Sequence, residues 1–124
     1  MILVDTSSWI HFLRPDGDIA VRARVSAALE AGVACWCPMV RLELWNGAQG
    51  DREKRVLREF ERLIPALPMT VEVWNLADER ARRCRKAGVT VPATDLLIDA
   101  CAVHHGATLE HADSDFDAIA AAVL

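Results

Sequence analysis

Short aliphatic runs alternate with longer segments of helical periodicity along this chain. Residues 2–4 form one such run, and we expect further strands over 33–37 and 107–111. The segments between them repeat apolar residues every three to four positions, as amphipathic helices do. Strands separated by helices pair in parallel, with helices on both faces of the sheet. The alternation therefore predicts an α/β three-layer sandwich with a central, mainly parallel sheet flanked by helices.

Seven segments have the residue pattern of helices. Hydroxyl-bearing residues precede four of them, namely Thr6 to Ser8, Thr70, Thr94 and Ser114, and such residues are preferred N-caps. Asp117 lies three positions after Ser114, as in a capping box. The expected helices cover residues 9–13, 19–31, 38–46, 51–63 and 70–87, the stretch from Thr94 to Gly106, and the stretch that follows Ser114.

Size and charge narrow the classes of protein. The 124 residues are 52% hydrophobic, enough to fill one core, so we expect a single domain over 1–124. The net charge of -4 argues against binding nucleic acid through bulk positive charge, so any such partner must be held locally. Residues 87–124 contain six acids and no Lys or Arg. This last third either attracts a cation or forms a solvated acidic face.

The cysteines and the hydropathy pattern give two further expectations. No CxxC pair with a second ligand pair is present among the four cysteines, so we expect reduced cysteines in the core rather than structural zinc. There is no basic-then-apolar leader and no apolar run approaching about 18 residues. We therefore expect a cytoplasmic protein that does not associate with a membrane.

Acidic residues follow two of the predicted strands. Asp5 comes directly after residues 2–4, and Asp113 comes just after the last strand. Ligands of parallel sheets bind outside the carboxyl ends of the strands, so we expect both acids at the same edge of the sheet. Glu43 falls among apolar positions of its helix and is expected to face inward as well.

Asp95 and Asp99 stand four residues apart in an otherwise almost wholly apolar helix. At that spacing they share one face, where like charges repel. The helix dipole would stabilise Asp95 in the first turn by roughly 0.3 to 1 kcal/mol, but it does little for Asp99. Burying an ionised carboxylate is costly unless a proton, a cationic side chain or a metal neutralises it.

Several inward acids without an evident cationic partner fit a hard divalent cation. Mg²⁺ and Mn²⁺ prefer oxygen ligands, and a few carboxylates with waters bind one or two such ions. Ions of this kind activate water and offset charge during phosphodiester cleavage. The residues therefore indicate metal-dependent hydrolysis, without naming the substrate.

Four stretches in this order and spacing resemble the PIN-domain ribonucleases, and specifically the VapC toxins of bacterial VapBC toxin-antitoxin pairs. They are MILVDTSSWI, VRLELWNGA, TDLLIDACAVHHGA and HADSDFDAIA, and the resemblance covers essentially the whole chain. It implies a Mg²⁺- or Mn²⁺-dependent endoribonuclease that cleaves RNA and is neutralised by a small VapB-type antitoxin. It also implies a homodimer and a PIN-like fold, in which a mainly parallel sheet of four to five strands is sandwiched by helices.

The resemblance assigns roles to individual acids. Carried over by position, the catalytic residues and metal ligands of the family fall on Asp5, Glu43, Asp95 and Asp113. Asp5 and Asp95 would be direct ligands, and Glu43 and Asp113 would complete the acidic cluster, one of them through water. Cleavage would release the 3′-oxygen and leave a 5′-phosphate.

Four neighbouring residues receive supporting roles. Thr6 or Ser7 would hydrogen-bond and orient a carboxylate or a metal-bound water. Asp115 matches a recurrent acid of the family, with helix capping as the alternative. Asp99 departs from the family, which commonly has a small apolar residue there, so it either extends the acidic cluster or faces solvent.

RNA contacts and competing functions remain open at this level. Arg14, Arg41 and the cations of residues 80–86 are candidates to hold phosphates, although residues 80–86 also fit an exposed helix face. The four tryptophans fit core packing better than base stacking. A catalytically silent RNA- or protein-binding module is the alternative function. A phosphatase with an aspartyl nucleophile would need an acid at position 7, where Ser7 stands.

Overall fold

The computed structural model describes residues 1–124, which form seven helices and three strands. In chain order the elements are β1 (Ile2–Val4), α1 (Thr6–Leu13), α2 (Ile19–Glu30), β2 (Ala34–Cys35), α3 (Pro38–Asn46), α4 (Gly50–Leu63), α5 (Val71–Lys86), α6 (Ala93–His104), β3 (Thr108–Glu110) and α7 (Ser114–Ala122). The alternation of strands and helices is the one that the sequence predicts.

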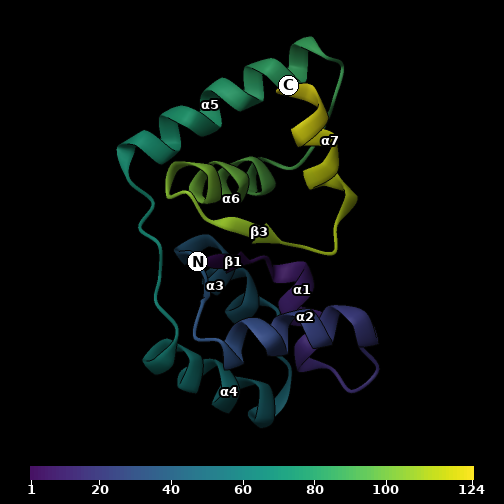
Figure 1. Ribbon diagram of the computed structural model, residues 1–124, viewed down its shortest axis with the longest axis vertical. Coiled ribbons are helices and arrows are strands. Elements are labelled where there is room, and N and C mark those ends of the chain that lie inside the picture. Colours follow the sequence, from purple (N-terminus) through teal and green to yellow (C-terminus); the bar gives the residue numbers. More distant parts are fainter.

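The strands form one parallel sheet in the order β2-β1-β3. Ile2 of the central strand is in register with Ala34 on one side and Thr108 on the other. The parallel sheet is confirmed, but the expected four to five strands are wrong. The extended segment after α4 meets the sheet only through a bridge between Trp36 and Ala66, because the chain then turns away toward α5 (Figure 1).

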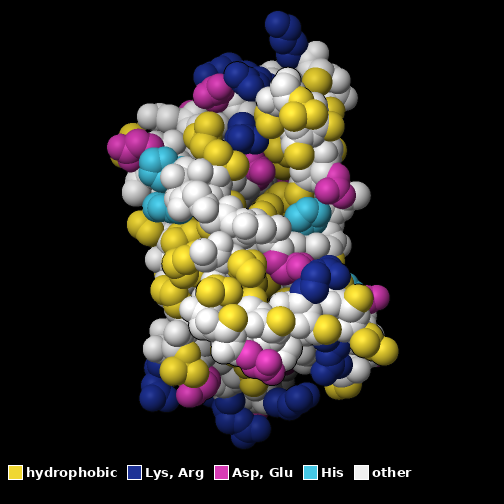
Figure 2. All heavy atoms as spheres, viewed as in Figure 1, with side chains coloured by type: hydrophobic (Ala, Val, Ile, Leu, Met, Phe, Trp, Pro, Cys, Tyr) yellow, Lys and Arg dark blue, Asp and Glu magenta, His cyan; other side chains and the backbone are white.

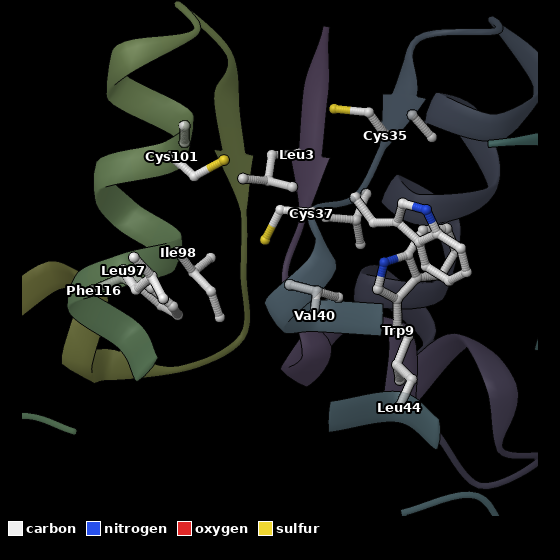
Figure 3. Packing of buried hydrophobic residues seen from close by; sticks show 14 of the residues in the cluster. Leu3, Trp9, Cys35, Cys37, Val40, Leu44, Leu97, Ile98, Cys101 and Phe116 are labelled. Atoms are coloured by element: carbon white, nitrogen blue, oxygen red, sulfur yellow. The ribbon is translucent and has the colours of Figure 1, made fainter. Parts of the chain in front are cut away.

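Helices lie on both sides of the sheet. In Figure 1, α5, α6 and α7 lie on one side of β1 and β3, and α1, α2 and α4 lie on the other. The fully buried Leu3 faces Ile98 and Cys101 of α6 (Figure 3). Beyond β1, the rings of Trp9 and Phe60 pack with their centroids 4.9 Å apart. Side chains from widely separated segments thus form a single core around β1.

The start of α1 explains how the chain holds an acid at the end of a buried strand. Asp5 is the N-cap of α1, and its side chain accepts a hydrogen bond from the backbone N–H of Ser7. The helix therefore begins at Thr6, three residues earlier than the sequence indicates. The hydroxyl residues expected to cap it belong to its first turn instead.

Two other cap predictions are wrong for similar reasons. Asp113 caps α7, so Ser114 is the first helical residue rather than the cap. Pro92 occupies the N-cap position of α6, and Thr94 lies inside the helix. The prediction for α5 is confirmed, since Thr70 accepts a hydrogen bond from the N–H of Val73.

The tryptophans and cysteines agree with the predictions only in part. All four cysteines are buried and free, as expected. Trp9 and Trp36 are fully buried in the core. Trp74 is 54% exposed, so the prediction of core packing is wrong for this residue. Trp45 is half-buried and donates its indole N–H to Glu61.

A buried ion pair joins α5 to α6. A guanidinium nitrogen of Arg80 lies 3.0 Å from a carboxylate oxygen of Asp99, and both side chains are at least 85% buried. Burial raises the pKa of Asp99, and the nearby Arg80 opposes that shift. Asp99 therefore neither extends an acidic cluster nor faces solvent, so both expectations for it are wrong. Arg80, assigned by its position to an exposed basic face, is committed to this pair.

No helix has the length and apolar character needed to cross a membrane. On the face seen in Figure 2, Lys and Arg side chains lie at both ends of the molecule, near α5 and near α4, and also over the region of α1 and α2.

We expect Arg80→Met to destabilise the protein by roughly 2 to 4 kcal/mol, because it leaves the carboxylate of Asp99 buried without its cation. The double variant Arg80→Met/Asp99→Leu should recover most of that loss, since no unpaired charge remains. Urea unfolding of both variants measures the effect.

Arg62→Met is the matched control, because Arg62 pairs with Glu59 on an exposed surface. Such a pair contributes about 0 to 1 kcal/mol. Equal decreases in the free energy of unfolding for Arg62→Met and Arg80→Met would show that the buried pair stabilises the protein no more than an exposed one.

Candidate active site

The candidate site lies where β1 and β3 end and begins with Asp5. This residue is 3% exposed, and its Oδ2 accepts hydrogen bonds from the N–H of Ser7 at 2.9 Å and from the Ser7 hydroxyl at 2.6 Å. The Ser7 hydroxyl in turn accepts from the N–H of Ala112 at 3.0 Å. Ser7 therefore fixes the carboxylate of Asp5 and ties it to the loop that follows β3.

Three further carboxylates converge from α6 and α7. One oxygen each from Asp95, Asp113 and Asp115 lies within 4.8 Å of the other two. Asp95 sits in the first turn of α6, and Asp113 is the N-cap of α7, where it accepts from the N–H of Asp115 at 2.9 Å. The order of the elements thus brings together acids that are 18 to 20 residues apart in sequence.

The raised pKa of Asp95 shows that this convergence disfavours its ionised form. Burial raises its pKa to about 7, helped next by the charge of Asp113, then by a hydrogen bond with Asp115 and by the charge of Asp5. Its Oδ2 is buried without a hydrogen-bond partner. Asp95 therefore has an oxygen that is free to accept a ligand, in surroundings that disfavour its own negative charge.

Glu43 reaches the same region from α3. Its Oε1 accepts a hydrogen bond from the Thr6 hydroxyl at 2.7 Å. Burial raises the pKa of Glu43, the Thr6 hydrogen bond opposes that shift, and the charge of Asp5 adds to it. The charge of Asp5 therefore acts on both Glu43 and Asp95.

The acidic cluster, meaning Asp5, Glu43, Asp95, Asp113 and Asp115, fits a hard cation. Its donors are carboxylate oxygens, which Mg²⁺ and Mn²⁺ prefer. Oxygens bound to one octahedral ion at about 2.1 Å lie about 3.0 Å apart in cis positions and about 4.2 Å apart in trans positions, so the 4.8 Å group would contract around a bound ion. The unpartnered Oδ2 of Asp95 is the atom that such an ion would satisfy.

The structure brings together most of the acids singled out in the sequence. Thr6 and Ser7 each hydrogen-bond to a carboxylate of the acidic cluster. Asp99 does not belong to it, since it pairs with Arg80 and is not among the charges that raise the pKa of Asp95. Asp115 lies within the cluster, whereas the capping alternative for it is wrong, because Asp113 is the N-cap of α7 and accepts the N–H of Asp115.

Sequence reasoning missed a support beside Asp5. Glu110, at the end of β3, accepts from the Ser8 hydroxyl and from the guanidinium of Arg24, each at 2.6 Å. The carbonyl of Glu110 also accepts from the N–H of Asp5 at 2.9 Å. Its position in the sequence could have predicted this role, because Glu110 ends a strand at the same sheet edge as Asp5.

Comparisons with known proteins agree with this geometry. The sequence model of the PIN domain matches residues 2–122. Ribonuclease VapC11 of Mycobacterium tuberculosis is 40% identical over 97% of this chain and 92% of its own. Among solved structures, FitAcB from Neisseria gonorrhoeae superposes with a TM-score of 0.77 at 22% identity, over 97% of this chain and 94% of that one.

VapBC-5 from Mycobacterium tuberculosis, described as a member of the VapBC family of toxin-antitoxin systems, has a TM-score of 0.68 at 20% identity. It covers 95% of this chain, which corresponds to 90% of the solved one. These two structures share the fold, whereas the sequence matches show the family. The chain belongs to the PIN domain family, within its VapC ribonucleases.

Proposed function

We propose that this protein is the toxin of a toxin-antitoxin pair and acts as a Mg²⁺- or Mn²⁺-dependent endoribonuclease. The main support is the unpartnered, buried Oδ2 of Asp95 within a group of three carboxylates. The second support is the 40% identity to a VapC ribonuclease over nearly the whole chain. One or two ions would be held by Asp5 and Asp95, with Glu43 and Asp113 completing the set.

The residues of the chain position the reaction. Ser7 and Thr6 orient the carboxylates of Asp5 and Glu43 through short hydrogen bonds. When bound, a divalent ion lowers the pKa of water and offsets the charge that builds up on the phosphate oxygens. Water held at the acidic cluster attacks the phosphorus in line, and departure of the 3′-oxygen leaves a 5′-phosphate.

Further parts of the proposal concern partners and setting. A VapB-type antitoxin is the proposed inhibitor, because the VapBC-5 structure comes from a toxin-antitoxin system with the same fold. We further propose that residues 1–124 act as a single domain, that two copies form a homodimer, and that the protein cleaves RNA in the cytoplasm. The one contiguous core supports the single-domain assignment.

A catalytically silent binding module is the second candidate. It would retain the fold and the raised pKa of Asp95, but it would bind no ion at the acidic cluster. Metal binding and RNA cleavage therefore discriminate between the two candidates.

We expect Asp5→Asn and Asp95→Asn each to lower RNA cleavage by at least about 100-fold, because each removes a charged ligand of the proposed ion. The rate of cleavage of a labelled RNA in the presence of Mg²⁺ measures the effect. Asp117→Asn is the matched control, since Asp117 belongs to the same acidic segment but is exposed. Wild-type rates in either site variant would place the reaction elsewhere.

Binding of the metal alone gives a separate test. Titration calorimetry with Mn²⁺ should show one or two sites in the wild-type protein and at least about tenfold weaker binding in Asp95→Asn. EDTA should stop cleavage, and added Mg²⁺ should restore it. The silent-module candidate would gain support if Mn²⁺ produced no heat with the wild-type protein.

Stability against pH provides a third prediction, for the metal-free protein. The folded state raises the pKa of Asp95 from 3.8 to about 7, so it binds the proton more tightly than the unfolded chain does. Asp95 therefore costs stability progressively as the pH rises from about 4 to about 7. Asp95→Asn should be more stable than wild type by roughly 1 to 3 kcal/mol at pH 8.

The difference between Asp95→Asn and wild type should vanish below about pH 4, where the carboxyl group is protonated in both states. Urea midpoints across this pH range, with EDTA present, provide the measurement. A gain that is the same at every pH would mean that the ionisation of Asp95 is not its source.

A further inference from the structure

Two buried thiols from α6 and the start of α3 share one part of the core. Cys37 is the N-cap residue of α3, and Cys101 lies in α6. Both are fully buried. Figure 3 shows their sulfur atoms turned into the same space between α6 and β1, beside Leu3. The proposed reaction makes no use of either thiol.

The segment between α4 and α5 holds the two thiols in place. The N–H of Leu67 donates to the carbonyl of Trp36, the residue before Cys37, at 2.8 Å. The thiol of Cys101 donates to the carbonyl of the same Leu67 at 3.9 Å. A single residue of this segment thus contacts the backbone next to one thiol and the sulfur of the other.

The two sulfurs are chemically unequal. The neighbouring Cys101 thiol lowers the pKa of Cys37 against the effects of burial and of the charge of Asp5, with further help from the N–H groups of Val40 and Met39 at the start of α3. The pKa of Cys101 is raised, first by the neighbouring Cys37 and then by burial. A position at a helix N-terminus beside a second thiol favours the thiolate of Cys37, whereas the burial of both sulfurs slows the access of an oxidant from solvent.

We propose that Cys37 and Cys101 are a redox site and form a reversible disulfide when the protein meets a peroxide. The thiolate of Cys37 attacks one oxygen of hydrogen peroxide, which gives a sulfenic acid and releases hydroxide. The Cys101 thiol then displaces the sulfenic hydroxyl group as water once its proton is transferred, and the S–S bond forms. Two electrons pass from the two sulfurs to the peroxide, and a dithiol reductant reverses the reaction.

The position of the pair links this bond to the acidic cluster. Glu43 follows Cys37 by six residues on α3, and Asp95 precedes Cys101 by six residues on α6. A disulfide of about 2.05 Å would tie the start of α3 to the middle of α6 and change the spacing of the helices that carry these two acids. This consequence rests on the proposed function, whereas formation of the bond does not.

The other two thiols are suited to serve as controls. Cys35 donates its S–H to the carbonyl of Ile2 at 3.4 Å, and burial raises its pKa to about 11. Cys84 is buried in α5. Neither has a helix N-terminus to favour its thiolate, so both should react slowly.

The experiment treats the folded, reduced protein with hydrogen peroxide and maps its peptides by mass spectrometry without reduction. We expect the Cys37–Cys101 cross-link, with the loss of two hydrogens, in wild type, Cys35→Ser and Cys84→Ser, and its absence in Cys37→Ser and Cys101→Ser. The wild-type map alone decides the pairing if a serine variant fails to fold. Oxidation that stops at single sulfenic or sulfinic acids, or a cross-link through Cys35 or Cys84, would overturn the proposal.

The link to the site is tested on the oxidised and reduced forms of Cys35→Ser/Cys84→Ser, which keeps only the proposed pair. Mn²⁺ affinity by calorimetry should be about tenfold lower in the oxidised form and should recover after treatment with a dithiol. Equal affinities would refute the link to the acidic cluster. A reduced protein that binds no Mn²⁺ and cleaves no RNA, yet forms the cross-link, would refute the proposed function while the redox site stands.

Discussion

The repulsion among carboxylates at the end of a three-stranded sheet is the constraint around which this structure is built. Asp5 and Asp95 are among the few polar residues buried in the protein, and their charges act on one another. Gathering these acids at one position lowers the free energy of unfolding, so stability alone does not explain the arrangement. Helix dipoles offset part of this repulsion, because the N-termini of α1, α6 and α7 carry acids of the cluster and favour negative charge.

The same residues serve both the fold and the site. Asp5 and Asp113 each cap a helix by accepting a backbone N–H, so each would remain hydrogen-bonded whether or not an ion is present. Asp95 has no such partner for its Oδ2, and its pKa rises accordingly. The acidic cluster therefore contains two carboxylates that the fold requires and one that only a ligand or a proton would satisfy.

The sequence predicts much of this because its signals are local. Aliphatic runs, glycines and helical spacing locate the elements, and the position of Asp5 after a strand indicates its edge of the sheet. Spacing alone cannot separate Asp95 from Asp99, which share a helical face but meet different neighbours. Asp99 is neutralised by Arg80, 19 positions earlier in the sequence, and that contact depends on how α5 packs against α6. The three strands read from the residues are all present, and the higher number expected from the resemblance is not reached, because the extended segment after α4 adds only one bridge at the sheet edge.

The pairing of Arg80 also bears on how an acidic protein would attract RNA. Arg80 is bound to Asp99, Arg83 to Glu79 and Arg24 to Glu110, so several cations are already engaged within the protein. Arg14 and Arg62 also lie near carboxylates, those of Glu53 and Glu59. With a net charge of -4, attraction of a phosphate to the acidic cluster would, under the proposed function, depend on a bound divalent ion that reverses the local sign. The carboxylates that lower the stability of the folded chain would then be the same groups that make RNA binding depend on the metal.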